Sequence, residues 1–283
     1  MTATLSPTPS PLLSNLPLAR TAGWQYVLRL ADNALILGQR NAEWCGHGPV
    51  LEEDIALANI SLDLIGQARL LYARAGELEA ELTGRARHED DYAYWRGERE
   101  FRNWTLLELP HSGPLAGTAS SDRDYAVTIV RNFLYSALMV ELWSALAGSR
   151  DAGLAAIASK SIKEARYHLH HGADWLVRLG DGTELSHERT QRALDHLLPY
   201  MNECFVPDPV EQEAAAQGIA VPTAELRPAW QATVEQTVAE ATLTLPAATG
   251  FVSTGKQGLH SEHMSYLLAQ MQSLARAHPG AHW

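Results

Sequence analysis

Apolar residues recur along most of the chain with a period of about 3.6, the spacing that puts them on one face of an α-helix. The pattern predicts long helices over residues 24–44, 52–75, 122–146 and 154–179, and further helices over residues 186–204, 223–243 and 261–277. Residues 89–108 are rich in charged and aromatic side chains, which indicates two short helices with a break near Gly97. No segment alternates with the period of two that is typical of a β-strand. The chain is therefore predicted to be all-α, a four-helix bundle with additional C-terminal helices.

The first residues differ in composition from the rest of the chain. The opening "MTATLSPTPSPLLSNLPLARTAG" is rich in proline and has no basic residue before Arg20. It matches neither a secretory signal peptide nor a membrane anchor, and residues 1–22 are expected to form a flexible tail. Residues 23–283 are expected to form a single helical domain. They contain no apolar run of about 18 residues, so no membrane span is predicted.

Composition and charge narrow the class of protein. Hydrophobic residues make up 46% of the chain and charged residues 19%, which is typical of a soluble globular protein. The formal net charge of −11 argues against a nucleic-acid partner, because phosphates require a basic surface. The only cysteines, Cys45 and Cys204, form neither a CxxC motif nor a disulfide framework, so a reducing cytoplasm is expected.

The predicted helix over residues 52–75 is apolar on most of its sides, and such a helix is usually buried. Its polar exceptions form one stripe, because Asn59, Asp63 and Gln67 follow one another at intervals of four. Buried polar side chains need hydrogen-bond partners. The stripe is therefore expected to meet polar residues of another helix, or to be the remnant of a surface that once met a metal.

The stretch "KEARYHLHHG", residues 163–172, places Glu164, His168 and His171 on adjoining faces of a predicted helix. A di-iron bundle requires Glu-x-x-His on each of two helices and a carboxylate on each of the other two. Among the histidines, only His111 and His187 follow a glutamate by three residues, and neither lies in the middle of a predicted helix. The spacing therefore favours a hydrogen-bonded polar layer. A metal site, and acid–base chemistry by His168 with Glu164, both remain open.

Three long strings resemble a known family. They are "RLADNALILGQRNAEWCGHGPVLEEDIALANISLDLIGQARLLY", "SKSIKEARYHLHHGADWLVRLGDGT" and "TGKQGLHSEHMSYLLAQMQSL", and the last is followed by "HPGAHW" at the C-terminus. These strings resemble the PaaC family, one component of the bacterial ring-1,2-phenylacetyl-CoA epoxidase, and the likeness covers about residues 24–283. The resemblance implies a ferritin-like helical fold and a place in a cytoplasmic, multisubunit oxygenase of phenylacetate breakdown. It also implies a catalytic sister subunit that has the di-iron site, a further joining subunit, and a reductase that supplies electrons from NADPH.

The sister subunit resembles this chain at the bundle core, which allows its iron ligands to be compared with residues here. Its Asp-Glu-Ala-Gly-His motif corresponds to residues 63–67, so the ligating Glu and His are replaced by Leu64 and Gln67. Its Lys-Glu-Glu-Ser-Phe-His motif corresponds to residues 163–168, so the ligating Glu is replaced by Ala165 and only His168 is kept. Its third-helix aspartate falls near Ser136, and the first-helix ligand has no assigned counterpart. The resemblance therefore implies a degenerate site with no metal or cofactor in this chain, and a non-catalytic structural subunit.

The resemblance also implies that the chain contributes to an acyl-CoA pocket at the boundary with the catalytic sister subunit. The candidate residues for phenylacetyl-CoA are Glu100, Phe101, Arg102, Asn103, Gln212, Glu213 and Ala214. One alternative is a self-sufficient di-iron oxygenase or ferroxidase with unusual ligands, drawn from Glu43, Asp63, Glu141, Glu164 and His168. A free-standing helical carrier of an acyl ligand is a second alternative. Stoichiometry, homodimer formation by the isolated chain and the surface that faces the partner are left open.

Overall fold

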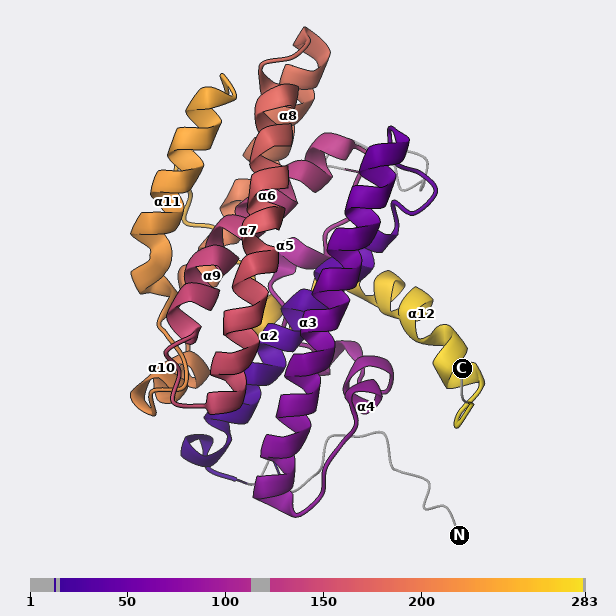
Figure 1. Cartoon of the computed structure of the whole chain (residues 1–283), viewed down its shortest axis with the longest axis vertical. Coiled ribbons are helices and arrows are strands. Elements are labelled where there is room, and N and C mark those ends of the chain that lie inside the picture. Colours follow the sequence, from indigo (N-terminus) through magenta and orange to yellow (C-terminus); the bar gives the residue numbers. More distant parts are fainter. Residues whose placement is uncertain (1–12, 14–15, 113–122, 282–283) are drawn as a thin grey trace.

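The computed structural model describes residues 13, 16–112 and 123–281 of the chain, and these residues form helices and loops with no β-strand (Figure 1). The all-α prediction is therefore confirmed. The helices are α2 (Leu18–Ala42), α3 (Leu51–Thr83), α4 (Glu89–Tyr94), η1 (Glu98–Glu100), α5 (Thr105–Glu108), α6 (Tyr125–Leu146), α7 (Ala152–Gly180), α8 (Glu184–Leu197), η2 (Leu198–Met201), α9 (Asn202–Phe205), α10 (Pro209–Ala216), α11 (Thr223–Glu240), η3 (Gly255–Gln257) and α12 (Glu262–Ala277).

Four long helices form the bundle as two tightly packed pairs. Helix α2 makes its most extensive contacts with α3, and α6 makes its most extensive contacts with α7. The pairs meet through α3 and α7, while α8 and α11 pack on α6 and α7, and α10 packs on α2. Helix α12 contacts α4 and α5 and projects from the side of the bundle, where the C-terminus lies (Figure 1).

Short sequence signals explain where the helices begin and end. Asp124 and Asp151 cap α6 and α7, because each carboxylate accepts a hydrogen bond from a backbone N–H of the first turn. Gly84 ends α3 in the left-handed conformation, with φ +75°, which glycine adopts without steric cost. Pro199 lacks a backbone N–H and cannot continue a helix beyond its first turn, so the chain changes to η2 at Leu198.

The structure corrects several predicted elements, and helix α3 continues to Thr83, beyond the predicted end at residue 75. Helix α2 begins at Leu18, so residues 18–22 belong to a helix and not to the predicted tail; residues 1–12 lie outside the described part of the chain. The predicted helix over residues 186–204 consists of α8, η2 and α9. Helix α10 was not predicted, because its prolines suggested only a break. Asp208 caps α10, and Pro209 occupies the first turn, where proline is tolerated.

Helix α6 forms the centre of the hydrophobic core. It is 22 residues long and apolar enough to pass a length and composition test for a membrane span, but 89% of the apolar window is buried inside the protein. That burial identifies α6 as a core helix of the bundle. Trp230 on α11 contributes to the same packing, since its indole N–H donates to the Leu134 carbonyl oxygen at 3.0 Å.

The prediction that α3 is buried on most sides is wrong. Its inner face, which includes Leu57, Ile60 and Leu64, is at most 2% exposed, as expected for a bundle helix. Its outer face carries large apolar side chains that are strongly exposed: Leu51, Ile55, Leu62, Ile65 and Leu70. Asn59 also lies on the exposed side and is not part of a buried polar layer. The continuous apolar pattern of α3 thus reflects two separate apolar faces, of which this chain covers one.

Candidate functional site

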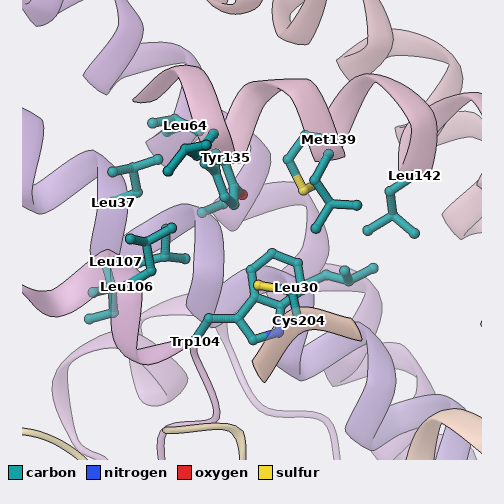
Figure 2. Close-up of a cluster of buried hydrophobic side chains, with 14 of the residues drawn as sticks. Leu30, Leu37, Leu64, Trp104, Leu106, Leu107, Tyr135, Met139, Leu142 and Cys204 are labelled. Atoms are coloured by element: carbon teal, nitrogen blue, oxygen red, sulfur yellow. The ribbon is translucent and has the colours of Figure 1, made fainter. Parts of the chain in front are cut away.

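Two of the positions matched to metal ligands of the sister subunit, residues 64 and 165, hold packed apolar side chains. Leu64 on α3 is 2% exposed and Ala165 on α7 is 3% exposed. Figure 2 shows Leu64 in the same buried cluster as Leu37 of α2 and Tyr135 of α6. A Cβ atom placed on Gly38 would lie only 3.2 Å from the Leu64 Cβ, so α2 approaches this position closely. The side of α2 that faces Leu64 therefore presents Leu37 and Gly38, and neither supplies a metal ligand.

The remaining polar residues of this layer bridge α3 to α7. The Gln67 amide donates to Glu164 Oε2 at 2.8 Å, and His168 Nε2 lies 3.0 Å from Asp63 Oδ2. Asp63 and Gln67 thus meet polar side chains of another helix, as the spacing suggested, whereas Asn59 does not. The Asp63 side chain is 39% exposed, so this bridge opens to solvent.

A third bridge was not predicted from the sequence. His171 Nε2 lies 2.8 Å from Glu53 Oε2, and the same oxygen accepts a hydrogen bond from the Tyr125 hydroxyl at 2.5 Å. The available signal was the position of His171 one turn beyond His168 on the same face of the helix. Its partner Glu53 lies in the first turn of α3, where an acidic residue also interacts favourably with the helix dipole.

The layer does not fit a di-iron centre. Ser136, the position matched to the third-helix aspartate, is buried on α6, where Asn132 accepts a hydrogen bond from the Asn41 amide at 3.1 Å. Two iron ions in a bundle require four carboxylates and two histidines, and the carboxylates balance the charge of the ions. Within the described residues, no group of three or more His, Cys, Asp or Glu side chains is placed to hold a metal ion. The histidines and carboxylates between α3 and α7 are instead used in pairs.

A second polar cluster is buried deeper, where the loop after α4 meets α2. Asp32 accepts hydrogen bonds from the Tyr72 hydroxyl at 2.7 Å, from the Arg102 backbone N–H at 2.9 Å, and from the Arg96 guanidinium. Asp32 is fully buried and Arg96 is 2% exposed. Burial and the adjacent Asp32 charge raise the pKa of the Tyr72 hydroxyl well above its usual value. Each charge in this cluster is neutralised and hydrogen-bonded within the protein.

Glu108 is the centre of a similar arrangement on α5. It accepts hydrogen bonds from the Asn103 amide at 2.9 Å, from the Ser261 backbone N–H at 2.6 Å, and from His260 Nδ1 at 2.6 Å. His260 Nε2 lies 3.1 Å from the Phe101 carbonyl oxygen. Both ring nitrogens face acceptors, so both carry protons and His260 is an imidazolium. Burial lowers the pKa of His260, but the hydrogen bond and charge of Glu108 raise it more, and the net pKa lies above the usual value.

His111 has the opposite charge state. Its Nδ1 accepts hydrogen bonds from the Trp44 indole N–H at 3.1 Å and from the Arg131 guanidinium at 2.8 Å, while its Nε2 faces the Arg40 carbonyl oxygen at 2.7 Å. Burial and the charge of Arg131 hold the pKa of His111 well below its usual value, so it is neutral. Burial and the charge of Arg40 also lower the pKa of Arg131 to about 9. This histidine is a structural acceptor.

The residues predicted to line an acyl-CoA pocket are mostly committed to the protein itself. Phe101, Asn103 and Ala214 are fully buried. The Arg102 guanidinium donates to the Phe101 carbonyl oxygen at 2.7 Å, and burial lowers its pKa.

The other four of these residues lie nearer the surface or at the ends of short helices. Glu100 Oε2 accepts a hydrogen bond from the Gly97 N–H at 2.6 Å, and Glu213 Oε1 accepts one from the Gln217 amide at 2.9 Å. Gln212 is exposed on α10, and Arg102 is half-buried. Both predicted segments adjoin α2, one through Asp32 and the other through the packing of α10.

Comparison with known proteins places this architecture in a family. The profile of the family described as "Phenylacetic acid catabolic protein" matches residues 14–283, nearly the whole chain. This chain belongs to the phenylacetic acid catabolic protein family. A curated relative, the C component of the 1,2-phenylacetyl-CoA epoxidase of Escherichia coli (strain K12), is 45% identical over 258 residues. Those residues make up 91% of this chain and 98% of the relative.

The family assignment agrees with the fold and with the resemblance seen in the sequence. This member of the phenylacetic acid catabolic protein family is an all-α, ferritin-like bundle formed by α2, α3, α6 and α7. At two positions matched to metal ligands of the sister subunit it has Leu64 and Ala165, which are part of its hydrophobic core. The functional question is therefore what such a bundle does in a phenylacetate pathway.

Proposed function

We propose that this chain is a non-catalytic structural subunit of a phenylacetyl-CoA 1,2-epoxidase complex in aerobic phenylacetate degradation. Its partners in this proposal are the di-iron catalytic sister subunit and the joining subunit, and a separate reductase delivers electrons from NADPH. The whole complex is cytoplasmic in this proposal. The relative, named as one subunit of such an epoxidase and identical at 45% of the aligned positions, supports the assignment to a multisubunit enzyme.

The observation that carries the proposal is the apolar filling of the ligand layer. A carboxylate at residue 64 would be buried in the hydrophobic cluster that includes Leu37 and Tyr135. Burying an unpaired carboxylate costs several kcal/mol, so the layer favours the leucine that is present. The Gln67–Glu164 and Asp63–His168 bridges then hold α3 to α7, the role that bridging metal ions would otherwise have.

The chain's own residues would act on the reaction only from a distance. Its rigid bundle would hold the catalytic sister subunit in the arrangement in which the metal site is complete. Residues of the loop after α4 would border the acyl-CoA pocket at the boundary between the subunits. Of the predicted pocket residues, Arg102 is half-buried and carries a charge that suits a CoA phosphate or carbonyl oxygen.

The central experiment compares the catalytic sister subunit expressed by itself with the same protein co-expressed with this chain. We expect co-expression to raise the soluble yield of the catalytic sister subunit, together with its oxygenase activity, and we expect this chain to bind no iron. Near-stoichiometric iron in this chain, purified by itself, would favour the self-sufficient oxygenase or ferroxidase instead. Equal yield and activity with and without this chain would contradict the structural role.

The pocket contribution is tested separately with Arg102→Ala in the reconstituted complex. We expect a higher KM for phenylacetyl-CoA with little change in kcat, because the guanidinium would contribute binding and not chemistry. Arg192→Ala, an arginine on the exposed side of α8, is the matched control. A KM equal to that of the wild type would remove Arg102 from the pocket and leave the structural role unaffected.

A further inference from the structure

A cleft opens beside α11, on the side of the bundle opposite α12 (Figure 1). One wall is α11, and a second wall is formed by η2 and α9. The third side is the segment of residues 243–251, which follows α11 without regular secondary structure and which we name the strap. The cavity has a volume of about 160 Å³. It shares no lining residue with the polar clusters or with the predicted acyl-CoA residues described above.

The strap is held at both of its ends by side-chain amides. The Gln191 amide on α8 donates to the Thr244 carbonyl oxygen at 2.7 Å, and its oxygen accepts from the Thr244 N–H at 2.9 Å. The Asn202 amide on α9 donates to the carbonyl oxygens of Thr249 and Phe251 at 3.2 Å and 3.0 Å. These contacts fix the strap on both sides of the cleft, so the open space between the strap and α11 is maintained by the fold.

The floor of the cleft is apolar and partly aromatic. Phe205 and Trp230 are 5% and 6% exposed, and their ring centroids lie 4.9 Å apart. The Trp230 indole N–H is already used by the Leu134 carbonyl oxygen, so Trp230 offers the cleft only apolar surface. An apolar cavity of about 150 Å³ is large enough to bind one benzene ring. The cleft therefore has room for one aromatic ring, which packs favourably against other rings.

Arg227 is the one cationic residue among the described residues that line the cleft. It precedes Trp230 by three residues, so the two side chains lie on the same face of α11. Its guanidinium lies 5.5 Å from the centroid of the Phe205 ring, and it has no hydrogen bond or ion pair with any described residue. A positive charge without a counter-charge thus lies at the edge of the aromatic floor.

The acidic residue of the lining, Glu235, does not neutralise Arg227. It lies eight residues further along α11, which corresponds to about 12 Å. Its Oε1 accepts a hydrogen bond from the Gln231 amide at 2.6 Å. An anionic group is therefore favoured at the Arg227 end of the cleft and disfavoured at the Glu235 end.

We propose that this cleft binds a small aromatic monocarboxylate, with its ring on Phe205 and Trp230 and its carboxylate paired with Arg227. The volume limits the apolar part to about one ring, and the guanidinium matches a carboxylate with two parallel N–H donors. A pocket of this kind, mostly apolar with one charged group that orients the ligand, is typical of small-molecule sites. The inference involves no partner subunit and does not rest on the proposed function.

The first test measures binding of benzoate, and of benzamide as its neutral analogue, to the full-length chain by isothermal titration calorimetry. We expect a Kd of about 0.1–1 mM for benzoate, which is realistic for a ligand of this size. Benzamide should bind about ten-fold more weakly, because it lacks the charge that pairs with Arg227. Equal affinities for the two compounds, or no binding of benzoate at about 10 mM, would overturn the inference.

The second test repeats both titrations with Arg227→Ala. We expect the Kd for benzoate to rise about ten-fold and the Kd for benzamide to stay unchanged, because only the carboxylate uses the guanidinium. Arg192→Ala, which removes an arginine that is 45% exposed on α8 and outside the cleft, is the matched control and should bind both compounds like the wild type. An unchanged Kd for benzoate, or an equal loss for both compounds, would show that Arg227 does not recognise the carboxylate, and the inference would be wrong.

The third test locates the site with Ala248→Phe, which fills the cleft from the strap. Ala248 is an exposed lining residue, so the larger side chain should leave the fold intact and block both benzoate and benzamide. Ala232→Phe, on the exposed side of α11 and outside the lining, is the matched control and should bind like the wild type. Thermal unfolding checks that both variants are folded. If folded Ala248→Phe binds benzoate like the wild type, the ligand lies elsewhere and the inference fails, while the proposed structural role is unaffected.

Discussion

The carboxylates in the two polar regions of the interior differ in burial and in the number of hydrogen bonds that they accept. Between α3 and α7, Asp63 has a single side-chain partner, His168, and remains 39% exposed. The second region comprises the buried clusters centred on Asp32 of α2 and Glu108 of α5. Both carboxylates are fully buried, and each accepts hydrogen bonds from three or more donors. The first region holds the positions that the resemblance matched to iron ligands of the sister subunit, and the second was not part of that comparison.

This difference shows what buried charge requires in a protein of this fold. A buried carboxylate is retained only if its partners compensate the lost hydration, and removal of a partner then becomes costly. The cluster of Asp32 and Glu108 meets that condition with arginine, histidine, tyrosine and backbone donors. In the α3–α7 layer the Asp63–His168 pair is partly solvated, and such a pair contributes little. Stability should therefore depend on the second region far more than on the first.

The largest expected effect comes from Asp32→Asn. It would leave the buried Arg96 guanidinium without its carboxylate, which we expect to lower the free energy of unfolding by about 3–5 kcal/mol. Urea unfolding of the purified chain measures the change. Asp63→Asn is the same chemical change in the α3–α7 layer and should cost less than about 1 kcal/mol. Equal losses for the two variants would contradict the comparison.

An intermediate effect, which depends on pH, is expected for His260→Gln. The folded pKa of His260 is raised, so its contribution to stability is fully present below its unfolded pKa of about 6.5 and is lost as the pH rises through the folded pKa. The stability difference between wild type and variant should therefore be largest below about pH 6.5 and shrink as the pH rises through the raised folded pKa.

The control for this pH dependence is His170→Gln, because His170 is 75% exposed on α7. Its stability difference from the wild type should stay small and nearly constant over the same range. Chemical unfolding at several pH values measures both series. A difference for His260→Gln that grows with pH would show that His260 is neutral in the folded protein, contrary to its two acceptor contacts.

The smallest effect is expected for Glu164→Gln. The amide can still accept a hydrogen bond from Gln67, so the loss should stay below about 1 kcal/mol. Glu108→Gln is the matched change in the buried cluster, and it should cost about 2–3 kcal/mol because it removes the counter-charge of His260. If Glu164→Gln were as costly as Glu108→Gln, the α3–α7 bridges would carry more of the stability than their exposure indicates.

Local signals predicted much of the fold. The periodicity of apolar residues placed all four bundle helices. The boundaries were less predictable: α10 was missed because Pro209 suggested a break, although Asp208 before it is a good helix cap. The exposure of Leu62 was also not predicted, because an exposed apolar residue on a helix has the same periodic pattern as one that faces the core.

Residue spacing along one helix predicted part of the site. Contacts between residues that are distant in the sequence could not be predicted in this way. The spacing predicted that the stripe with Asp63 and Gln67 would meet polar residues of another helix, but it did not identify Glu164 as the partner of Gln67. The hydrogen bonds that Asp32 and Glu108 accept were not predicted, because partners such as Arg96 and His260 are 64 and 152 residues away in the sequence. The pocket residues 100–103 and 212–214 remain a prediction that rests on resemblance, and most of their side chains are engaged within the chain.

Residues 253–261 supply hydrogen-bond donors that the chain needs to complete its folding after synthesis. Glu203 receives hydrogen bonds from Ser253 and from the Lys256 backbone N–H, and Glu108 receives them from His260 and Ser261. The donor residues from 253 onward are synthesised last, so a polypeptide that ends before residue 253 lacks them. Premature termination in this region would release a product with two poorly compensated buried carboxylates, which quality-control proteases would recognise as incompletely folded.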